Sequence, residues 1–205
     1  MGTGFLGLRR ADLMRVGALG VVVACANVLD LLTTYCASPT LVHEWNVLHR
    51  KLGLGWPGLI GAKLVGGACA VAGYAFYLRH RHACYPVAGL GLSAFGRAFL
   101  LGSPTAGVHA RRILVTLGYL WAAMQALVAW VAIDNLLIYF GYSPPFRGLD
   151  PMAYHLSQGM LISGAALWRM VVANHAEYVQ LPAHAVTFAR AGHVPADARQ
   201  SAPSA

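Results

Sequence analysis

The stretch LMRVGALGVVVACANVLDLLTTYCA, residues 13–37, decides the fold class of this chain. It is apolar over nearly its whole length, and about 20 apolar residues are enough for a helix to cross the hydrocarbon core of a bilayer. Residues 57–78, 113–140 and 152–173 have the same character. The sequence therefore predicts an all-α integral membrane protein that folds as a four-helix transmembrane bundle.

The composition agrees with this fold class. Of 205 residues, 58% are hydrophobic and only 11% are charged, whereas a soluble domain carries about 25% charged residues. In a soluble protein the formal net charge of +8 would suggest a nucleic-acid partner. In a membrane protein it indicates arginines on the cytoplasmic side, where anionic lipid lies. We therefore expect the lipid bilayer as a partner and no nucleic acid, and we interpret RHRH, residues 79–82, as a cytoplasmic anchor.

A fifth apolar segment, residues 83–102, is ambiguous because it contains Pro86, several glycines and Arg97. If this segment does not cross the membrane, one side holds ten arginines, which are Arg9, Arg10, Arg15, Arg79, Arg81, Arg97, Arg111, Arg112, Arg190 and Arg199. The other side then holds only Arg50, Lys51 and Arg147. This split follows the positive-inside rule, with both termini on the cytoplasmic side of a cell (inner) membrane. The rule favours four spans plus an interfacial or re-entrant segment, with five spans as the alternative.

The chain divides into a transmembrane helical domain, residues 1–175, and a tail, residues 176–205. The tail is rich in alanine, proline and polar residues and has no periodic apolar face, so we expect a mobile cytoplasmic segment. The N-terminus resembles a signal peptide, since arginines precede an apolar run that ends at Ala26. Because the helical pattern continues without a break to Ala37, we expect no cleavage.

Polar residues of the four predicted spans gather at one depth. At a rise of about 1.5 Å per residue, they lie roughly 5 to 10 Å below the outer interface. These residues are Asp30, Lys63, Asp134, His155 and Gln158. A charge that faces lipid costs at least about 2.5 kcal/mol at the centre of a helix, so these side chains should turn into the bundle.

Helical spacing adds a direction to this depth. Asn27, Asp30 and Thr34 share one face of the first helix. We expect an ion pair between Asp30 and Lys63, with the polar side chains of the third and fourth spans nearby. Ionisable residues inside a membrane indicate a functional site, but polar side chains can also simply join helices. Both interpretations, a binding site and a structural network, stay open at this point.

The polar residues of the first two spans and of the loop between them follow a pattern. It consists of Asn27-x-x-Asp30-x-x-x-Thr34, then Glu44-x-Asn46 in the loop, then Lys63. It resembles the opening hairpin of a family of small multi-span bacterial and archaeal membrane proteins of unknown function, which has an N-x-x-D-x-x-x-T helix, an E-x-N-P loop and a lysine in the second span. This chain has Val47 where that family has proline. The resemblance covers residues 27–63 and implies that the patterned residues form one constellation, without implying an activity.

Metal and cofactor sites have little support in the sequence. The four cysteines form no CxxC pair, so we infer neither a disulfide framework nor a zinc site. His43 and His49 of the outer loop do not share a helical face, so we predict no metal site there. Haem b is an alternative, with His155 or His175 as a ligand, but their partner histidines would lie in loops or at helix boundaries. We therefore predict no cofactor.

The chain shows no large soluble domain and no nucleotide-binding or catalytic signature. We therefore expect a non-enzymatic polytopic membrane protein. It would be an accessory or assembly subunit of a larger membrane complex, or a small binding protein with a polar site in the outer third of the bilayer. The alternative is a small oligomeric transporter or proton-coupled carrier, in which Asp30, Lys63 and Asp134 exchange protons or ions. A membrane enzyme acting on lipid and a haem protein are further alternatives.

Overall fold

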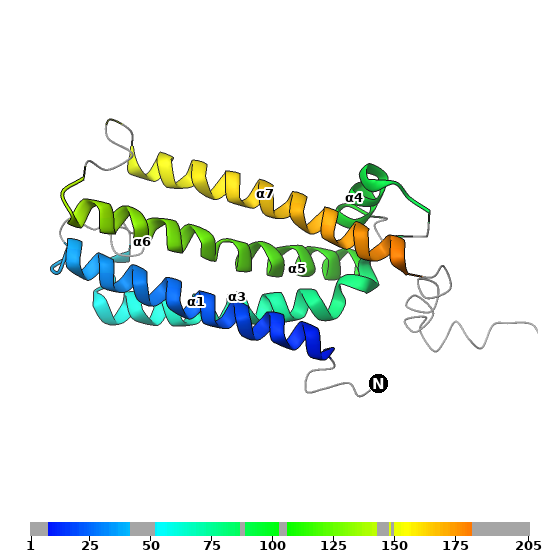
Figure 1. Ribbon diagram of the computed structural model, residues 1–205, viewed down its shortest axis with the longest axis horizontal. Coiled ribbons are helices and arrows are strands. Elements are labelled where there is room, and N and C mark those ends of the chain that lie inside the picture. The colour runs from blue at the N-terminus through cyan, green and yellow to red at the C-terminus, as the bar shows by residue number, and fades with distance from the viewer. Residues whose placement is uncertain are drawn as a thin grey trace, which may run out of the picture.

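The computed structural model describes residues 8–41, 52–86, 89–102, 106–142, 148 and 150–181. Within these residues the chain is all-helical, with 84% of the residues in helices and no strand. Four long rods run side by side and form an elongated bundle (Figure 1). The predicted all-α fold class is therefore confirmed.

The rods correspond to the four predicted spans. They are α1 (Arg10–Ala37), α3 (Trp56–His80), α5 (Ala106–Ala123) continuing into α6 (Gln125–Tyr139), and α7 (Pro151–Gln180). Each rod contains a helix long and apolar enough to cross a membrane. A break at Met124 separates α5 from α6 within the third rod. These four apolar helices suggest a membrane-embedded protein.

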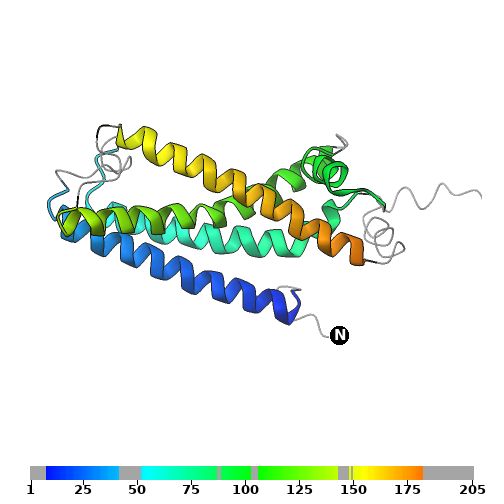
Figure 2. The ribbon, with the colours of Figure 1, turned by 45° about the horizontal axis from the view of Figure 1, so that its top comes forward.

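The ambiguous segment, residues 83–102, forms no fifth long helix in the part of the chain that the structure describes. It holds the end of η2 (Arg81–Cys84) and the helix α4 (Leu92–Leu100). With nine residues, α4 is about 14 Å long at 1.5 Å per residue, which is too short for a hydrocarbon core of about 30 Å. Figures 1 and 2 show α4 beside the last part of α7, against which it packs.

The predicted boundary between the helical domain and the tail, at residue 176, was wrong. Residues 176–180 are predicted to belong to the tail, but they form the C-terminal end of α7. The helix continues because side chains of this part bond to other parts of the chain. Glu177 accepts from Arg81 of η2, and the Tyr178 hydroxyl accepts from the backbone N–H of Leu90, which lies just before α4. The remainder of the predicted tail, from residue 182, lies outside the described residues.

Small residues set the distance between α3 and α5. A Cβ atom added to Gly73 would lie 2.9 Å from the Cα atom of Gly118, so the two backbones touch at this point. Such close approach is typical of helix pairs in membranes, where packing rather than water exclusion holds helices together. α1 in turn packs against α3 and α6, and α7 packs against α5 and α6.

The two ends of the bundle differ in chemistry. We call the end where α1 and α5 begin and α3 and α7 end the basic end, because most of the arginines lie there. It also carries the best-packed core, in which Tyr77, Phe95, Phe99 and Met170 are buried. Elsewhere the rods expose large apolar side chains such as Val21, as expected for surfaces that face lipid.

Candidate functional site

An ion pair joins α1 to α3 in the half of the bundle away from the basic end. Nζ of Lys63 lies 2.5 Å from Oδ2 of Asp30. The Asp30 side chain is 5% exposed and the Lys63 side chain is 18% exposed, so the pair is largely sheltered but open on the lysine side. The expected contact between these two residues therefore forms. The second carboxylate oxygen of Asp30, Oδ1, is buried and has no hydrogen-bond partner among the described residues.

The same face of α1 also bonds to α6. Asn27 donates from Nδ2 to Oε1 of Gln125 at 2.9 Å and to the backbone oxygen of Val23 at 2.8 Å. Two turns further along α1, Nδ2 of Asn135 donates to the hydroxyl of Thr34 at 3.1 Å. Asn27, Asp30 and Thr34 thus face neighbouring helices, as the i, i+3, i+7 spacing predicts.

The other members of the expected cluster lie around the pair at different distances. His155 of α7 is near enough to Asp30 for the two side chains to interact electrostatically. Asp134 of α6 is buried at 3% exposure and interacts with Trp130, one turn earlier on the same helix. Among the described residues, no hydrogen bond or ion pair connects Asp134 or Gln158 to the Asp30–Lys63 pair. Residues at equal depth are thus placed differently: His155 lies within electrostatic range of Asp30, whereas Asp134 does not contact the pair.

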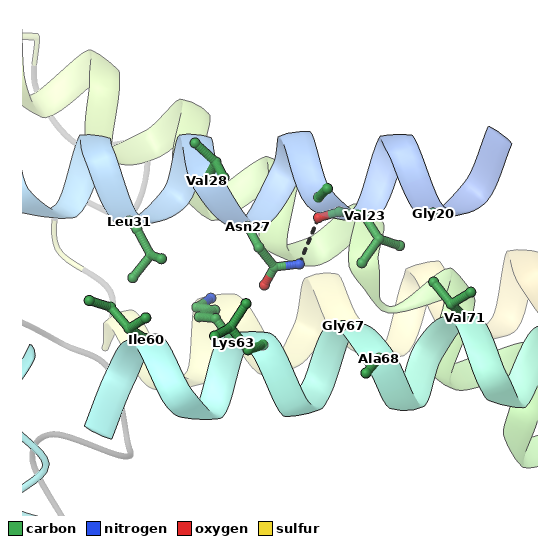
Figure 3. A pocket seen from close by; sticks show the side chains of 12 residues that line it. Gly20, Val23, Asn27, Val28, Leu31, Ile60, Lys63, Gly67, Ala68 and Val71 are labelled. Atoms are coloured by element: carbon green, nitrogen blue, oxygen red, sulfur yellow. Dashed lines mark hydrogen bonds between the residues drawn. The ribbon is translucent and has the colours of Figure 1, made fainter. Parts of the chain in front are cut away.

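A groove runs between α1 and α3 beside this pair (Figure 3). Its volume is about 290 Å³, and its lining is apolar except for Asn27 and Lys63. Gly20, Ala24 and Ala68 leave the space open because their side chains are small or absent. Figure 3 shows the carbonyl oxygen of Asn27 turned toward α3 and the Lys63 side chain on the opposite wall. Asn27 and Lys63 are thus the two polar groups in the lining of an otherwise apolar groove.

Two residues of the predicted constellation, Glu44 and Asn46, lie outside the described residues. The same holds for His43 and His49 of the outer loop. In the described part of the chain, no three His, Cys, Asp or Glu side chains are grouped so that they could hold a metal ion. His175, considered as a haem ligand, has Nε2 3.2 Å from the backbone oxygen of Leu90 at the basic end.

A second polar network, which sequence reasoning missed, lies at the basic end. Arg81 is only 2% exposed, and its Nε donates to Oε2 of Glu177 at 3.1 Å. Its Nη2 lies 3.6 Å from Oδ1 of Asp12, a residue that also pairs with Arg9 and Arg15. The interpretation of residues 79–82 as a cytoplasmic anchor was therefore wrong for Arg81. Its guanidinium instead joins α1, η2 and α7.

Polar side chains of α7 complete this second network. The hydroxyl of Tyr85 donates toward Oδ1 of Asn174 at 3.1 Å, and Nδ2 of Asn174 donates to the Tyr77 hydroxyl at 2.8 Å. Burial raises the pKa of Tyr85 above its ordinary value, so its hydroxyl stays neutral and can donate. Nε2 of His82 lies 2.9 Å from Oε1 of Glu177. Asn174 and Glu177 share a face of α7 at i, i+3, and this spacing is the sequence signal for the network, but both residues lie beyond the predicted end of the span at residue 173.

The two networks differ in how well their polar atoms are satisfied. At the basic end, Glu177 accepts hydrogen bonds from Arg9 and Arg81 and lies 2.9 Å from Nε2 of His82, so its charge is fully partnered. In the other half of the bundle, and apart from the ion pair, Oδ1 of Asp30 and Oδ2 of Asp134 are buried without a hydrogen-bond donor among the described residues. A saturated network holds helices together, whereas buried acceptors without a donor can take up a further proton or polar group.

No protein-family model, no curated protein and no solved structure matches this chain. A function of this chain therefore follows from the residues of the groove and of the two networks.

Proposed function

We propose that this chain is a small, non-enzymatic multi-span membrane protein that binds an uncharged amphipathic molecule dissolved in the membrane, in the groove between α1 and α3. The observation that supports this function is the Asp30–Lys63 ion pair on the edge of an apolar groove. Between a binding protein and an accessory subunit, we favour the binding protein because the groove is a site within the chain itself.

The polar groups of the groove suit a hydroxyl or carbonyl head. Lys63 has three N–H donors, and its contact with Asp30 leaves donors on the side where the lysine is exposed. Both N–H groups of Asn27 are engaged by Val23 and Gln125, so its carbonyl oxygen is the group that can accept a further bond. A hydroxyl head could accept a hydrogen bond from Lys63 and donate one to the carbonyl oxygen of Asn27.

The charges argue for an uncharged head. Asp30 and Lys63 form a pair with no net charge, so a charged ligand would bring an uncompensated charge into a medium of low dielectric constant. The apolar lining from Gly20 to Leu31 would receive the rest of the molecule. At 1.5 Å per residue this part of α1 is about 16 Å long, enough for an extended hydrocarbon chain.

Filling the groove should abolish binding without disturbing the fold. Ala68 lines the groove and is exposed, so Ala68→Trp occupies the space while leaving the bundle core unchanged. We expect a photoreactive analogue of hexadecanol to label α1 and α3 peptides of the purified protein, and Ala68→Trp to lower this labelling at least tenfold. Quantitative mass spectrometry of the labelled peptides measures the effect.

Ala165→Trp is the matched control, because Ala165 is exposed on α7 and away from the groove. It should label like the unmodified protein. The same analogue of palmitic acid, which carries a charged head, should label the groove more weakly. Equal labelling of all three proteins, or stronger labelling by the acid, would contradict the proposal.

A proton-coupled carrier is the second candidate, and the buried oxygens of Asp30 and Asp134 favour it. Each has an acceptor atom without a donor among the described residues, which is where a proton or cation could bind. In vesicles containing the protein and a pH-sensitive dye, we expect proton uptake that Asp134→Asn reduces at least tenfold. Uptake equal to that of protein-free vesicles would reject this candidate while leaving the binding function intact.

A further inference from the structure

Arg112, in the second turn of α5, is a buried cation that takes no part in either polar network. Arg112 is 6% exposed, and its Nε and Nη1 atoms are buried without a hydrogen-bond partner among the described residues. Arginine stays charged at every physiological pH and carries five N–H donors in a planar fork. A buried guanidinium of this kind is costly unless an anion accompanies it.

The surroundings of Arg112 form a basic corner, which we define as Cys84, Gly102, Arg111 and Arg112. The guanidinium lies directly against the backbone of Gly102, so that a Cβ atom there would collide with Nη1. Gly102 has φ +46°, a left-handed conformation that glycine adopts easily. Both arginines lie near enough to Cys84 to act electrostatically on its thiol. The corner is thus positively charged, and the backbone of Gly102 covers the guanidinium of Arg112.

The chain's own carboxylates are committed elsewhere. It has seven acidic residues, and at the basic end Asp12 and Glu177 pair with Arg9, Arg15, Arg81 and His82. Asp30 pairs with Lys63, Asp134 lies beside Trp130, and Asp150 caps the start of α7. The other two, Glu44 and Asp197, lie outside the described residues. Within the described part of the chain, then, the basic corner has no anion of its own.

We propose that the basic corner binds a phosphate group, supplied by an anionic phospholipid of the adjacent leaflet or by free phosphate. A planar guanidinium matches phosphate oxygens with two parallel hydrogen bonds. The position fits a lipid, because Leu101 beside the corner is 69% exposed and Arg97 on α4 is exposed as well. The exposed apolar side chain of Leu101 would contact the acyl chain of such a lipid, while the guanidinium would bind its phosphate. A small outward shift of the Gly102 main chain opens Nη1 to the phosphate.

Thermal unfolding of the delipidated protein in an uncharged detergent tests this site. Dioctanoyl-phosphatidylglycerol should raise the unfolding midpoint by about 2 to 4 °C, since a ligand that binds only the folded state stabilises it. Inorganic phosphate at the same concentration distinguishes the sources: an equal rise identifies free phosphate as sufficient, and a smaller rise identifies the lipid. Dioctanoylglycerol, which lacks phosphate, should give no rise.

Arg112→Gln should abolish the rise, whereas Arg10→Gln, which removes an exposed arginine at the same end, should keep it. If Arg112→Gln does not fold, Arg112→Lys is used, which keeps the charge but loses the fork and should bind at least threefold more weakly. The proposal is overturned if the Arg112 variant responds like the unmodified protein, or if dioctanoylglycerol is as effective. It is also overturned if Asp197→Asn destabilises the protein as much as Arg112→Gln and no phosphate compound has an effect.

Discussion

Asp30→Asn and Lys63→Met should each lower the free energy of unfolding by about 3 to 5 kcal/mol, and the double variant should recover most of that loss. Each single change leaves one charge buried without its partner. In Asp30→Asn the ammonium of Lys63 loses the carboxylate whose Oδ2 lies 2.5 Å away and faces an uncharged amide instead, and in Lys63→Met the carboxylate of Asp30 loses its only ion-pair partner among the described residues. The double variant removes both charges and replaces them with groups that cost less to bury. Reversible unfolding in mixed micelles, followed by circular dichroism, measures all three variants.

A weaker contact between two helices provides the matched comparison. Thr34 and Asn135 join α1 to α6 by one hydrogen bond of 3.1 Å, so Thr34→Val combined with Asn135→Leu should show a coupling of about 0.6 kcal/mol. If the Asp30 and Lys63 variants add without recovery, the pair is not the source of their stability effect and its assignment as a coupled buried pair fails.

The double variant also separates a structural role from a binding role. If Asp30→Asn with Lys63→Met restores stability and keeps labelling by the hexadecanol analogue, the pair only joins α1 to α3. If it restores stability and loses the labelling, Lys63 is required for binding, as its position on the groove implies. Stability and labelling are separate readouts, so an unstable protein cannot be mistaken for one that has lost its ligand.

The fold could be predicted because the bilayer imposes a simple rule on the sequence. Apolar runs of about 20 residues must be helices that satisfy their own backbone hydrogen bonds, and the structure has helices at all four of them. The same rule located the Asp30–Lys63 pair, since charges at equal depth on adjacent helices gain by meeting. Depth and spacing along a single helix are therefore readable from sequence.

The direction in which a side chain points around the helix axis, and the packing at helix ends, are harder to predict from the sequence. Asp134 has the expected depth, but its side chain interacts with Trp130 of its own helix rather than with the ion pair. Arg81 follows the last turn of α3, where the positive-inside rule assigns an arginine to the lipid surface, yet it is buried between Asp12 and Glu177. Its burial depends on the extension of α7 past residue 173, a tertiary effect that no local pattern specifies.

Arg81→Ala should lower the free energy of unfolding by about 3 kcal/mol or more, because it removes the cation that Asp12 and Glu177 share. Arg79→Ala is a close control, since Arg79 lies two residues earlier and is exposed, and it should change the free energy by at most about 0.5 kcal/mol. Equal effects of the two substitutions would show that burial of Arg81 contributes nothing to stability.

The combination of Arg81→Ala with Lys63→Met tests whether the two ends of the bundle are independent. Lys63 and His80, the last residue of α3, are about 26 Å apart at 1.5 Å per residue, Arg81 follows directly in η2, and the networks share no residue. Their effects should therefore add to within about 0.5 kcal/mol, as expected for distant sites without common partners. Labelling of the groove by the hexadecanol analogue should be unchanged in folded Arg81→Ala. A coupling larger than 1 kcal/mol would instead mean that α3 transmits a rearrangement from the basic end to the groove, and a loss of labelling would place Arg81 in control of ligand access.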